Sequence, residues 1–280
     1  MRTERPRLAT AAQQDSDPDA LPAPRVHPSA VVAPEVQLGA GSEVGPFCRL
    51  EGRVRVGMRC RFGTGAVIGS APMDRNYRGE DTAVVIGSDN VFCEYVTANR
   101  ATGDGKMTII GDSNLVMAYV HIGHNCRIGS GCIITNGVQL AGHVEVGDRA
   151  NIGGLTGIHQ FCRVGELAMV GACSYVNKDV PPFVVAAGNP CRVRGLNLRG
   201  MERAGVPREA VLLLKQVYRL VYRSGLNLAQ AVAQIEAEIL PSAQPGCGLE
   251  QIGSFLEFAQ TTRRGLELRT GDDSETVGSE

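Results

Sequence analysis

The fold is decided by the stretch from Ile110 to Val170, which divides into sixes as IGDSNL-VMAYVH-IGHNCR-IGSGCI-ITNGVQ-LAGHVE-VGDRAN-IGGLTG-IHQFCR-VGELAM-V. Every six begins with Ile, Leu or Val, and Gly often follows. A period of six fits neither a helix nor a plain amphipathic strand. It predicts a parallel β-helix in which three sixes, or 18 residues, close one triangular coil. The branched residue points into the prism, and the following Gly is expected to suit the tight corner.

The period also predicts which residues meet, because positions 18 apart stack on adjacent coils about 4.8 Å apart. Remainders after division by 18 place four of the five histidines on one edge of the prism, across three coils. These are His121, His124, His143 and His159. A repeat needs no imidazoles for its stability, so this edge is the main functional signal in the sequence.

Composition favours a narrow repeat fold and excludes several classes of protein. The 280 residues include 35 glycines and only 5% aromatics, and the net charge is −1. This charge gives no reason to expect a nucleic acid partner. The N-terminus lacks a basic segment followed by an apolar run, and no apolar stretch reaches the ~18 residues of a membrane span. We therefore expect a cytoplasmic protein without stable membrane insertion.

The nine cysteines mostly follow the repeat. Five fall at the fifth position of a six, which favours a small inward side chain: Cys48, Cys60, Cys126, Cys132 and Cys162. A free cysteine serves there as a small hydrophobe. No CxxC pair occurs. We predict reduced structural cysteines, with no disulfide and no bound metal.

The chain is expected to have four parts. Residues 1–25 are rich in Pro, Asp, Gln and Arg and are predicted to be a disordered leader. The β-helix is predicted for 26–190, with two breaks in the repeat, at 70–82 and 98–107. Both gaps keep the phase of the sixes, and loops that leave a solenoid often carry function.

The C-terminal part switches to a helical period. Pro181, Pro182 and Pro190 are expected to end the β-helix, because proline cannot donate in a ladder. Residues 191–264 are predicted to form a helical domain after a linker through 200, with helices opening near 207, at the Asn227 cap and near 248. Residues 265–280 are expected to be a flexible acidic tail.

Several motifs together resemble one family. HIGHNC begins at His121, LAGHVEVGD at Leu140, GIHQFCRVG at Gly157 and DVPPFVVAAGNP at Asp179. With the YRLVYRSG helix, they resemble the acyl-ACP–UDP-N-acetylglucosamine O-acyltransferases, which open lipid A biosynthesis. The resemblance covers about 26–259. It implies a left-handed β-helix that works as a homotrimer, with sites between neighbouring subunits.

The resemblance also implies roles for residues. His124 matches the general base that deprotonates the 3-hydroxyl of the glucosamine, and the Gly142 N–H matches the oxyanion donor. The donor is a 3-hydroxyacyl chain on acyl carrier protein, and no cofactor is needed. Further matches are Asp74, His121, His143, His159 and Gln160 for sugar and donor, Asn197 and Arg203 for the nucleotide and phosphates, and Met169 and Ala172 for the acyl channel.

The sequence departs from the family pattern at four positions near these sites. They are Asn76 for the usual Lys, Asn125 for the Asp that often follows the catalytic His, Arg199 for a Glu, and Ala204 for an Arg. The acyl-transfer residues are present. The departures bear on recognition of the UDP-sugar.

Three other functions fit parts of the sequence. The same His base would serve an N-acyltransferase acting on a UDP-3-amino sugar. His121, His124 and His143 resemble the zinc ligands of trimeric γ-class carbonic anhydrases. A non-catalytic scaffold would leave the histidine edge without a purpose, and the carbonic anhydrase would leave the C-terminal motifs unexplained.

Overall fold

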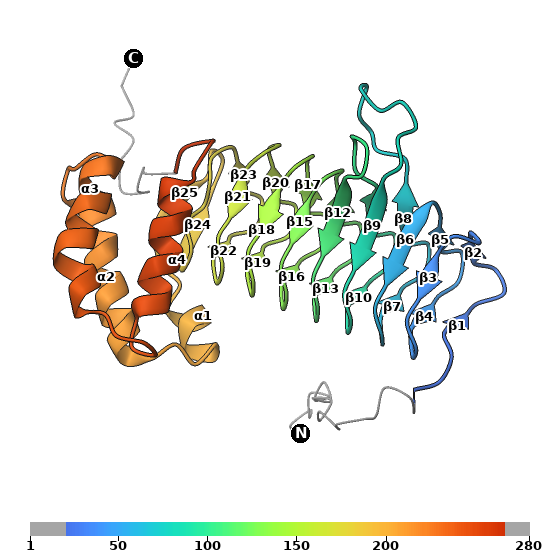
Figure 1. Ribbon diagram of the computed structural model, residues 1–280, viewed down its shortest axis with the longest axis horizontal. Coiled ribbons are helices and arrows are strands. Elements are labelled where there is room, and N and C mark those ends of the chain that lie inside the picture. The colour runs from blue at the N-terminus through green and yellow to red at the C-terminus, as the bar shows by residue number, and fades with distance from the viewer. Residues whose placement is uncertain (1–20, 267–280) are drawn as a thin grey trace, which may run out of the picture.

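The computed structural model describes residues 21–266 of the chain. It is an elongated left-handed parallel β-helix with helices packed at its C-terminal end (Figure 1). The predicted fold class is confirmed. The N-terminal leader, except for residues 21–25, lies outside the described residues.

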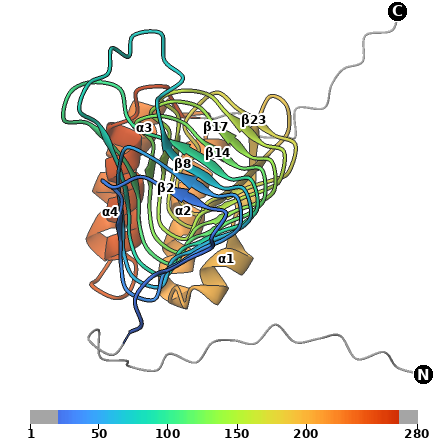
Figure 2. The ribbon, with the colours of Figure 1, turned by 90° about the vertical axis from the view of Figure 1, so that its right-hand side faces the viewer.

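Three sheets form the faces of the prism, here called A, B and C, and the end-on view shows their triangular arrangement (Figure 2). Sheet A contains β1 (Arg25–Val26), β4 (Glu43–Val44), β7 (Arg61–Phe62), β10 (Val91–Phe92), β13 (Leu115–Val116), β16 (Ile133–Ile134), β19 (Asn151–Ile152), β22 (Met169–Val170), β24 (Val184–Ala187) and β25 (Arg192–Leu196). Sheet B contains β2 (Val31–Val32), β5 (Arg49–Leu50), β8 (Val67–Ser70), β11 (Thr97–Asn99), β14 (His121–Ile122), β17 (Gln139–Leu140), β20 (Gly157–Ile158) and β23 (Tyr175–Val176). Sheet C contains β3 (Gln37–Leu38), β6 (Arg53–Val56), β9 (Ala83–Ile86), β12 (Met107–Ile110), β15 (Arg127–Ile128), β18 (Glu145–Val146) and β21 (Arg163–Val164).

Each two-residue strand contributes one outward-facing and one inward-facing residue. Arg127 is exposed on β15, whereas the next residue, Ile128, is only 3% exposed. The branched residues of successive coils stack into one continuous core. The five cysteines predicted to face inward are all buried, and none of the nine cysteines, all of which lie within 21–266, forms a disulfide. Burial raises the pKa of the Cys126 thiol to about 12, so it behaves as a small apolar group.

Both loops leave the prism at the same corner, between sheets B and C. The first follows β8 and the second follows β11. They lengthen their coils, because Arg53 pairs with Ala83 (83 − 53 = 30) and Ile109 pairs with Val85 (109 − 85 = 24). The sixes stay in phase as predicted, but 18-residue stacking holds only where no loop intervenes.

Glycines after the branched residues have a different role from the one expected. Gly123 and Gly129 have ordinary backbone angles, and the left-handed conformation falls two residues later, at Asn125 (φ 61°) in the first case. A Cβ on Gly123 would lie 2.8 Å from the Leu140 carbonyl oxygen of the next coil. Glycine is therefore required by the close approach of neighbouring coils and not by the turn.

The β-helix ends in a hairpin. β24 pairs parallel with β22, and β25 then returns antiparallel to β24. The predicted helical domain therefore begins after β25 and not at 191. The last coil is covered by this hairpin and by the helices, which blunt an otherwise open edge.

The helical part contains α1 (Leu198–Arg203), α2 (Arg208–Arg223), α3 (Leu228–Gln234) and α4 (Leu249–Gln260). α3 continues through a π turn, η2 (Ile235–Ile239), and a 3-10 turn, η3 (Leu240–Ser242). Asn227 forms the predicted cap as part of a capping box with Gln230. The sequence did not predict α1, which begins where a linker was expected. Among the described residues, no helix is long and apolar enough to cross a membrane.

The end of the helical part also differs from the predicted boundary. Gly265 and Leu266 were assigned to a flexible tail. Leu266 is 3% exposed, and the Asp179 N–H donates to the Gly265 carbonyl oxygen at 2.9 Å. These residues return to the last coil of the β-helix. The rest of the predicted tail lies outside the described residues.

Candidate active site

The candidate site lies on the corner between sheets B and C, here called the BC edge. His124 and Asn125 follow β14, His143 follows β17, and His159 follows β20 on successive coils. The two inserted loops leave from this edge on the coils below. The sequence period therefore placed the histidine edge correctly.

His124 is oriented by its neighbour in sequence. Its Nδ1 lies 2.8 Å from Asn125 Oδ1. The amide of Asn125 is itself fixed by Thr102 in the second loop, because Oδ1 accepts the Thr102 N–H at 2.9 Å and Nδ2 donates to the Thr102 carbonyl at 3.1 Å. An amide oxygen only accepts, so Nδ1 of His124 carries the proton. Nε2 is left with a free lone pair, as a general base requires.

The Nε2 side of His124 lies against Gly142. A Cβ added to Gly142 would lie 2.5 Å from Cε1 of His124 and closer still to Nε2. Gly142 is buried, and its N–H takes part in none of the hydrogen bonds among residues 21–266. A basic nitrogen and an unused backbone donor therefore lie side by side. This is the pair that acyl transfer needs.

Two further histidines surround His124 and are kept neutral. Burial lowers the pKa of His121, and the nearby His124 lowers it further. Burial and His124 likewise lower the pKa of His143. His121 Nδ1 lies 2.8 Å from Thr97 Oγ1, and the His143 ring stacks on Phe161 with centroids 4.6 Å apart. At pH 7 both rings are hydrogen-bonding groups without charge.

Asp74 brings a negative charge to this edge from the first loop. The Asn76 N–H, 2.9 Å from Oδ1, lowers the pKa of Asp74, and the nearby His124 and His143 lower it further. Asp74 in turn opposes the lowering at His143. The structure thus brings Asp74 near His124 and His143, and its predicted role in binding the sugar stays a prediction.

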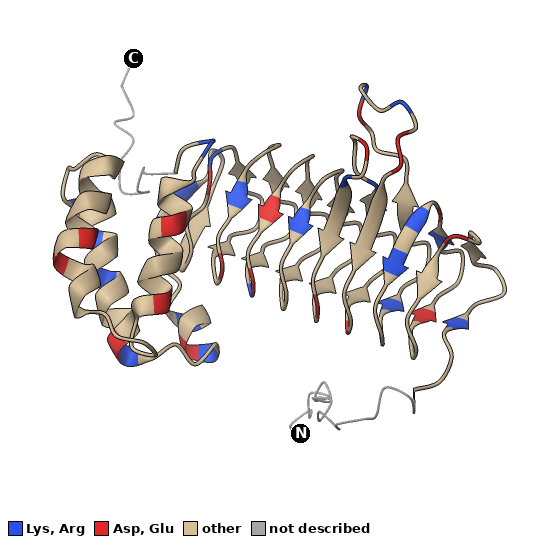
Figure 3. Ribbon diagram, viewed as in Figure 1, with Lys and Arg blue, Asp and Glu red and all other residues tan. Residues whose placement is uncertain are grey.

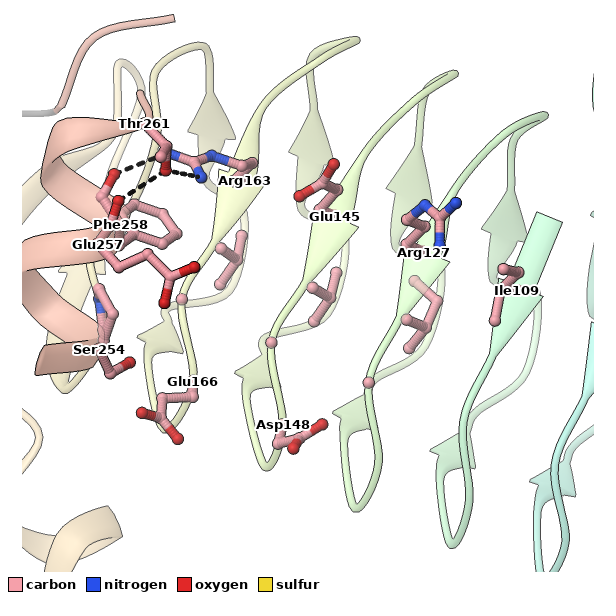
Figure 4. A pocket seen from close by; sticks show the side chains of 17 residues that line it. Ile109, Arg127, Glu145, Asp148, Arg163, Glu166, Ser254, Glu257, Phe258 and Thr261 are labelled. Atoms are coloured by element: carbon pink, nitrogen blue, oxygen red, sulfur yellow. Dashed lines mark hydrogen bonds between the residues drawn. The ribbon is translucent and has the colours of Figure 1, made fainter. Parts of the chain in front are cut away.

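A groove of about 440 Å³ runs from this edge across sheet B. Its lining includes His121, Gln139, His159, Gln160 and Tyr175. A larger groove, of about 570 Å³, lies between sheet C and α4 (Figure 4). Its lining is charged and includes none of the histidines of the BC edge, so the candidate site is the groove on sheet B.

Four predicted site residues lie away from the BC edge, namely Asn197, Arg203, Met169 and Ala172. Asn197 caps α1 by accepting the Gly200 N–H at 3.0 Å, and its Nδ2 donates to the Leu167 carbonyl at 2.7 Å. Arg203 is exposed at the end of α1. The departures Arg199 and Ala204 are on or next to the same helix. The roles predicted for Asn197 and Arg203 stay predictions.

Met169 and Ala172 are on and beside β22 in sheet A, and Ala172 is at the corner between sheets A and B. Within one chain, they therefore occupy a different edge from His124. An acyl channel that runs from His124 to Met169 and Ala172 would therefore have to include a second subunit. Their role in the acyl channel stays a prediction.

Sequence reasoning missed four contributors to this site. Phe161 lies one coil after His143 (161 − 143 = 18), so the spacing of the repeat could have identified it. Thr97 and Thr102 contact His121 and Asn125 across coils lengthened by a loop, so no fixed spacing revealed them. Arg264, whose Nη2 lies 3.1 Å from His159 Nδ1, is the last residue of the predicted helical domain, and no repeat spacing connects it to the β-helix.

The fold and the histidine edge define a transferase of the hexapeptide-repeat class. A family model described as "Bacterial transferase hexapeptide (six repeats)" matches residues 107–142. A second model, described as "Udp N-acetylglucosamine O-acyltransferase; Domain 2", matches residues 179–267. Together they match a part of the β-helix and the helical part of the chain.

Curated relatives specify the family. A protein of Paraburkholderia phymatum is 41% identical over 86% of this chain and 98% of its own length. One of Verminephrobacter eiseniae is 48% identical over 78% of this chain and 82% of its own. Both are named acyl-[acyl-carrier-protein]–UDP-N-acetylglucosamine O-acyltransferase. The chain belongs to the family of acyl-ACP–UDP-N-acetylglucosamine O-acyltransferases.

Solved structures agree with this family. LpxA from Acinetobacter baumannii has a TM-score of 0.79 and 33% identity, covering 86% of this chain and 98% of its own. LpxA from Bacteroides fragilis, a UDP-N-acetylglucosamine acyltransferase, has a TM-score of 0.77 at the same identity and coverage. The predicted resemblance is confirmed.

Proposed function

We propose that this protein transfers a 3-hydroxyacyl chain from acyl carrier protein to the 3-hydroxyl of the glucosamine in UDP-N-acetylglucosamine, the first step of lipid A biosynthesis. The observation that carries the proposal is the pairing of His124 with Gly142. An oriented imidazole with a free Nε2 lies beside an unused backbone N–H on the edge of a groove. The names of the relatives supply the two substrates.

The proposed reaction needs no covalent enzyme intermediate. His124 Nε2 removes the proton from the sugar 3-hydroxyl as its oxygen attacks the thioester carbonyl. The Gly142 N–H donates to the oxyanion that forms. Collapse of the intermediate breaks the C–S bond, and the released thiolate of the carrier protein takes the proton from His124. General base catalysis of this kind contributes ~10²- to 10⁴-fold, and one oxyanion donor ~10²- to 10³-fold.

The surrounding residues would hold the substrates without competing for the proton. His121 and His143 are neutral at pH 7 because their pKa values are lowered, so they can donate or accept hydrogen bonds. Asp74 is ionised, since its pKa is also lowered, and would accept from a sugar hydroxyl. His159 and Gln160, on the groove lining, would contact sugar or donor. The thioester supplies the driving force, so no cofactor is proposed.

We propose that the working form is a homotrimer. The corner between sheets A and B carries a row of residues at equivalent positions, here called the AB ridge: Phe47, Gly65, Tyr95, Tyr119, Gly137, Leu155 and Cys173. Tyr119 is 62% and Leu155 70% exposed. Solvent-exposed apolar rows of this length favour an interface.

The faces of the prism support the same assembly. Outward residues of sheet A include Leu115, Ile133 and Met169, whereas those of sheet C alternate in charge as Arg127, Glu145 and Arg163 (Figure 3). Packing sheet A against a neighbour would hide apolar surface and leave sheet C in water. Met169 and Ala172 would then approach a neighbour's groove, as the proposed channel requires.

We place the reaction in the cytoplasm because both proposed substrates are cytoplasmic compounds. A mass-spectrometric assay tests the function. Purified protein would be offered 3-hydroxyacyl-ACPs with UDP-N-acetylglucosamine or with the UDP-3-amino sugar. We expect an ester product from the first sugar. Amide product from the second sugar alone would assign N-acylation instead, and no transfer to either would contradict the proposal.

A further inference from the structure

The segment after α4 returns to the β-helix instead of leaving it. Thr262 Oγ1 donates to Asp179 Oδ2 at 2.7 Å, and the Asp179 N–H donates to the Gly265 carbonyl at 2.9 Å. The next residue, Leu266, is 3% exposed. The stretch from Thr261 to Leu266 is therefore docked on the last coil.

Arg163 holds this segment and the end of α4 in place. Its guanidinium lies over the Phe258 ring, 4.2 Å from the centroid, and Nη2 donates to the Phe258 carbonyl at 2.8 Å. Nη1 donates to Thr261 Oγ1 at 3.0 Å (Figure 4), and Nε to Asp179 Oδ2 at 3.2 Å. The carboxylate of Asp179 is almost fully buried. A buried charge with these partners fixes the position of the chain around it.

The docked segment delivers Arg264 to the candidate site. Arg264 Nη2 lies 3.1 Å from His159 Nδ1 and 3.4 Å from the Asn177 carbonyl oxygen. A guanidinium has donors only, so Nδ1 must accept from it. The Gln160 carbonyl oxygen also lies 3.1 Å from Nδ1, but it would need a proton on that nitrogen. The two contacts are mutually exclusive.

We propose that Arg264 is a positioning residue that selects the His159 tautomer protonated at Nε2. With Nδ1 held as the acceptor, the neutral ring has its proton on the other nitrogen. His159 lines the groove on sheet B, so it presents a hydrogen-bond donor to the bound substrate. The group it recognises is a hydrogen-bond acceptor of the substrate, such as a carbonyl or hydroxyl oxygen. The identity of that substrate rests on the proposed function, whereas the tautomer does not.

The chain offers variants that separate this role from charge and from folding. Arg264→Leu removes the donor, and Arg264→Lys restores one. Arg263→Leu removes the same charge from the adjacent exposed position and is the matched control. Thermal melting of each variant checks that the docked segment still holds.

The tautomer is measured by ¹⁵N NMR of histidine-labelled protein, with the His159 signals identified from a His159→Gln variant. We expect Nε2 protonation in wild type, Arg263→Leu and Arg264→Lys. Arg264→Leu should shift His159 toward protonation at Nδ1, which the Gln160 carbonyl favours. An unchanged His159 tautomer in Arg264→Leu would overturn the proposal.

Kinetics give the second readout. Loss of one properly placed donor should raise KM for one substrate by about 3- to 10-fold and change kcat less, with recovery in Arg264→Lys. An equal fall in kcat with no change in KM would contradict a binding role for the donor. If wild type transfers no acyl group, the proposed function fails, but the tautomer shift still decides the role of Arg264.

Discussion

Replacing Gly142 by Ala is the sharpest structural test of the proposed mechanism. The new Cβ would lie 2.5 Å from Cε1 of His124, whereas ordinary van der Waals contact begins near 3.4 Å. The ring must therefore move by about 0.9 Å (3.4 − 2.5). The backbone N–H remains, so only the position of the base changes. A misplacement of about 1 Å costs roughly 10²-fold in rate.

The assay is kcat/KM with 3-hydroxyacyl-ACP and UDP-N-acetylglucosamine, together with light scattering and a thermal melt. Gly154→Ala is the matched control. Gly154, like Gly142, is the third residue of its six-residue repeat, but it lies at another corner of the prism. Its Cβ would lie 3.1 Å from the Asn136 carbonyl oxygen, which requires a shift of only a few tenths of an ångström. We expect the control to keep activity. Activity within threefold of wild type in a folded Gly142→Ala variant would refute the proposed contact.

Three other predictions follow from the fold and the site. Stability should fall as pH drops below about 6.5, because the folded-state pKa of His121 is lowered and the unfolded chain binds its proton first; His121→Asn should show a smaller fall in Tm, and an equal fall would count against this cause. Tyr119→Arg, which puts charge on the AB ridge, should shift the proposed trimer toward monomer in light scattering, whereas an unchanged oligomeric state would place the interface elsewhere. Ala172→Gly should move the preferred acyl chain longer and Ala172→Met shorter, since each buried CH₂ is worth ~0.8 kcal/mol, and an unchanged optimum across a ladder of 3-hydroxyacyl-ACPs would exclude Ala172 as the end of the channel.

The repeat made much of this fold predictable. A branched residue every six positions fixes which side chains face inward, and the 18-residue coil then places His124 beside Gly142. The same arithmetic applies to His143 and Phe161, whose rings stack. These contacts are periodic, so sequence distance converts directly into position in space.

Contacts that break the period were not predictable. The loops change the coil length, which hid the pairing of Thr102 with Asn125. Arg264 reaches His159 through the docking of a helix end on the last coil, which depends on three-dimensional packing and not on a spacing. The short helix α1 depends on the side-chain cap of Asn197. Met169 and Ala172 lie on a different edge of the prism from His124, so their proposed role depends on the proposed trimer, which no spacing within one chain reveals.

Removal of the base tests the central claim most directly. His124→Ala takes away the proposed proton acceptor without touching the buried core, so the oligomeric state and the melting temperature should be preserved. Initial rates with purified 3-hydroxyacyl-ACP and UDP-N-acetylglucosamine should fall by ~10²- to 10⁴-fold, the usual contribution of a general base. A folded His124→Ala protein that keeps activity within threefold of wild type would contradict the assignment of His124 and the mechanism built on it.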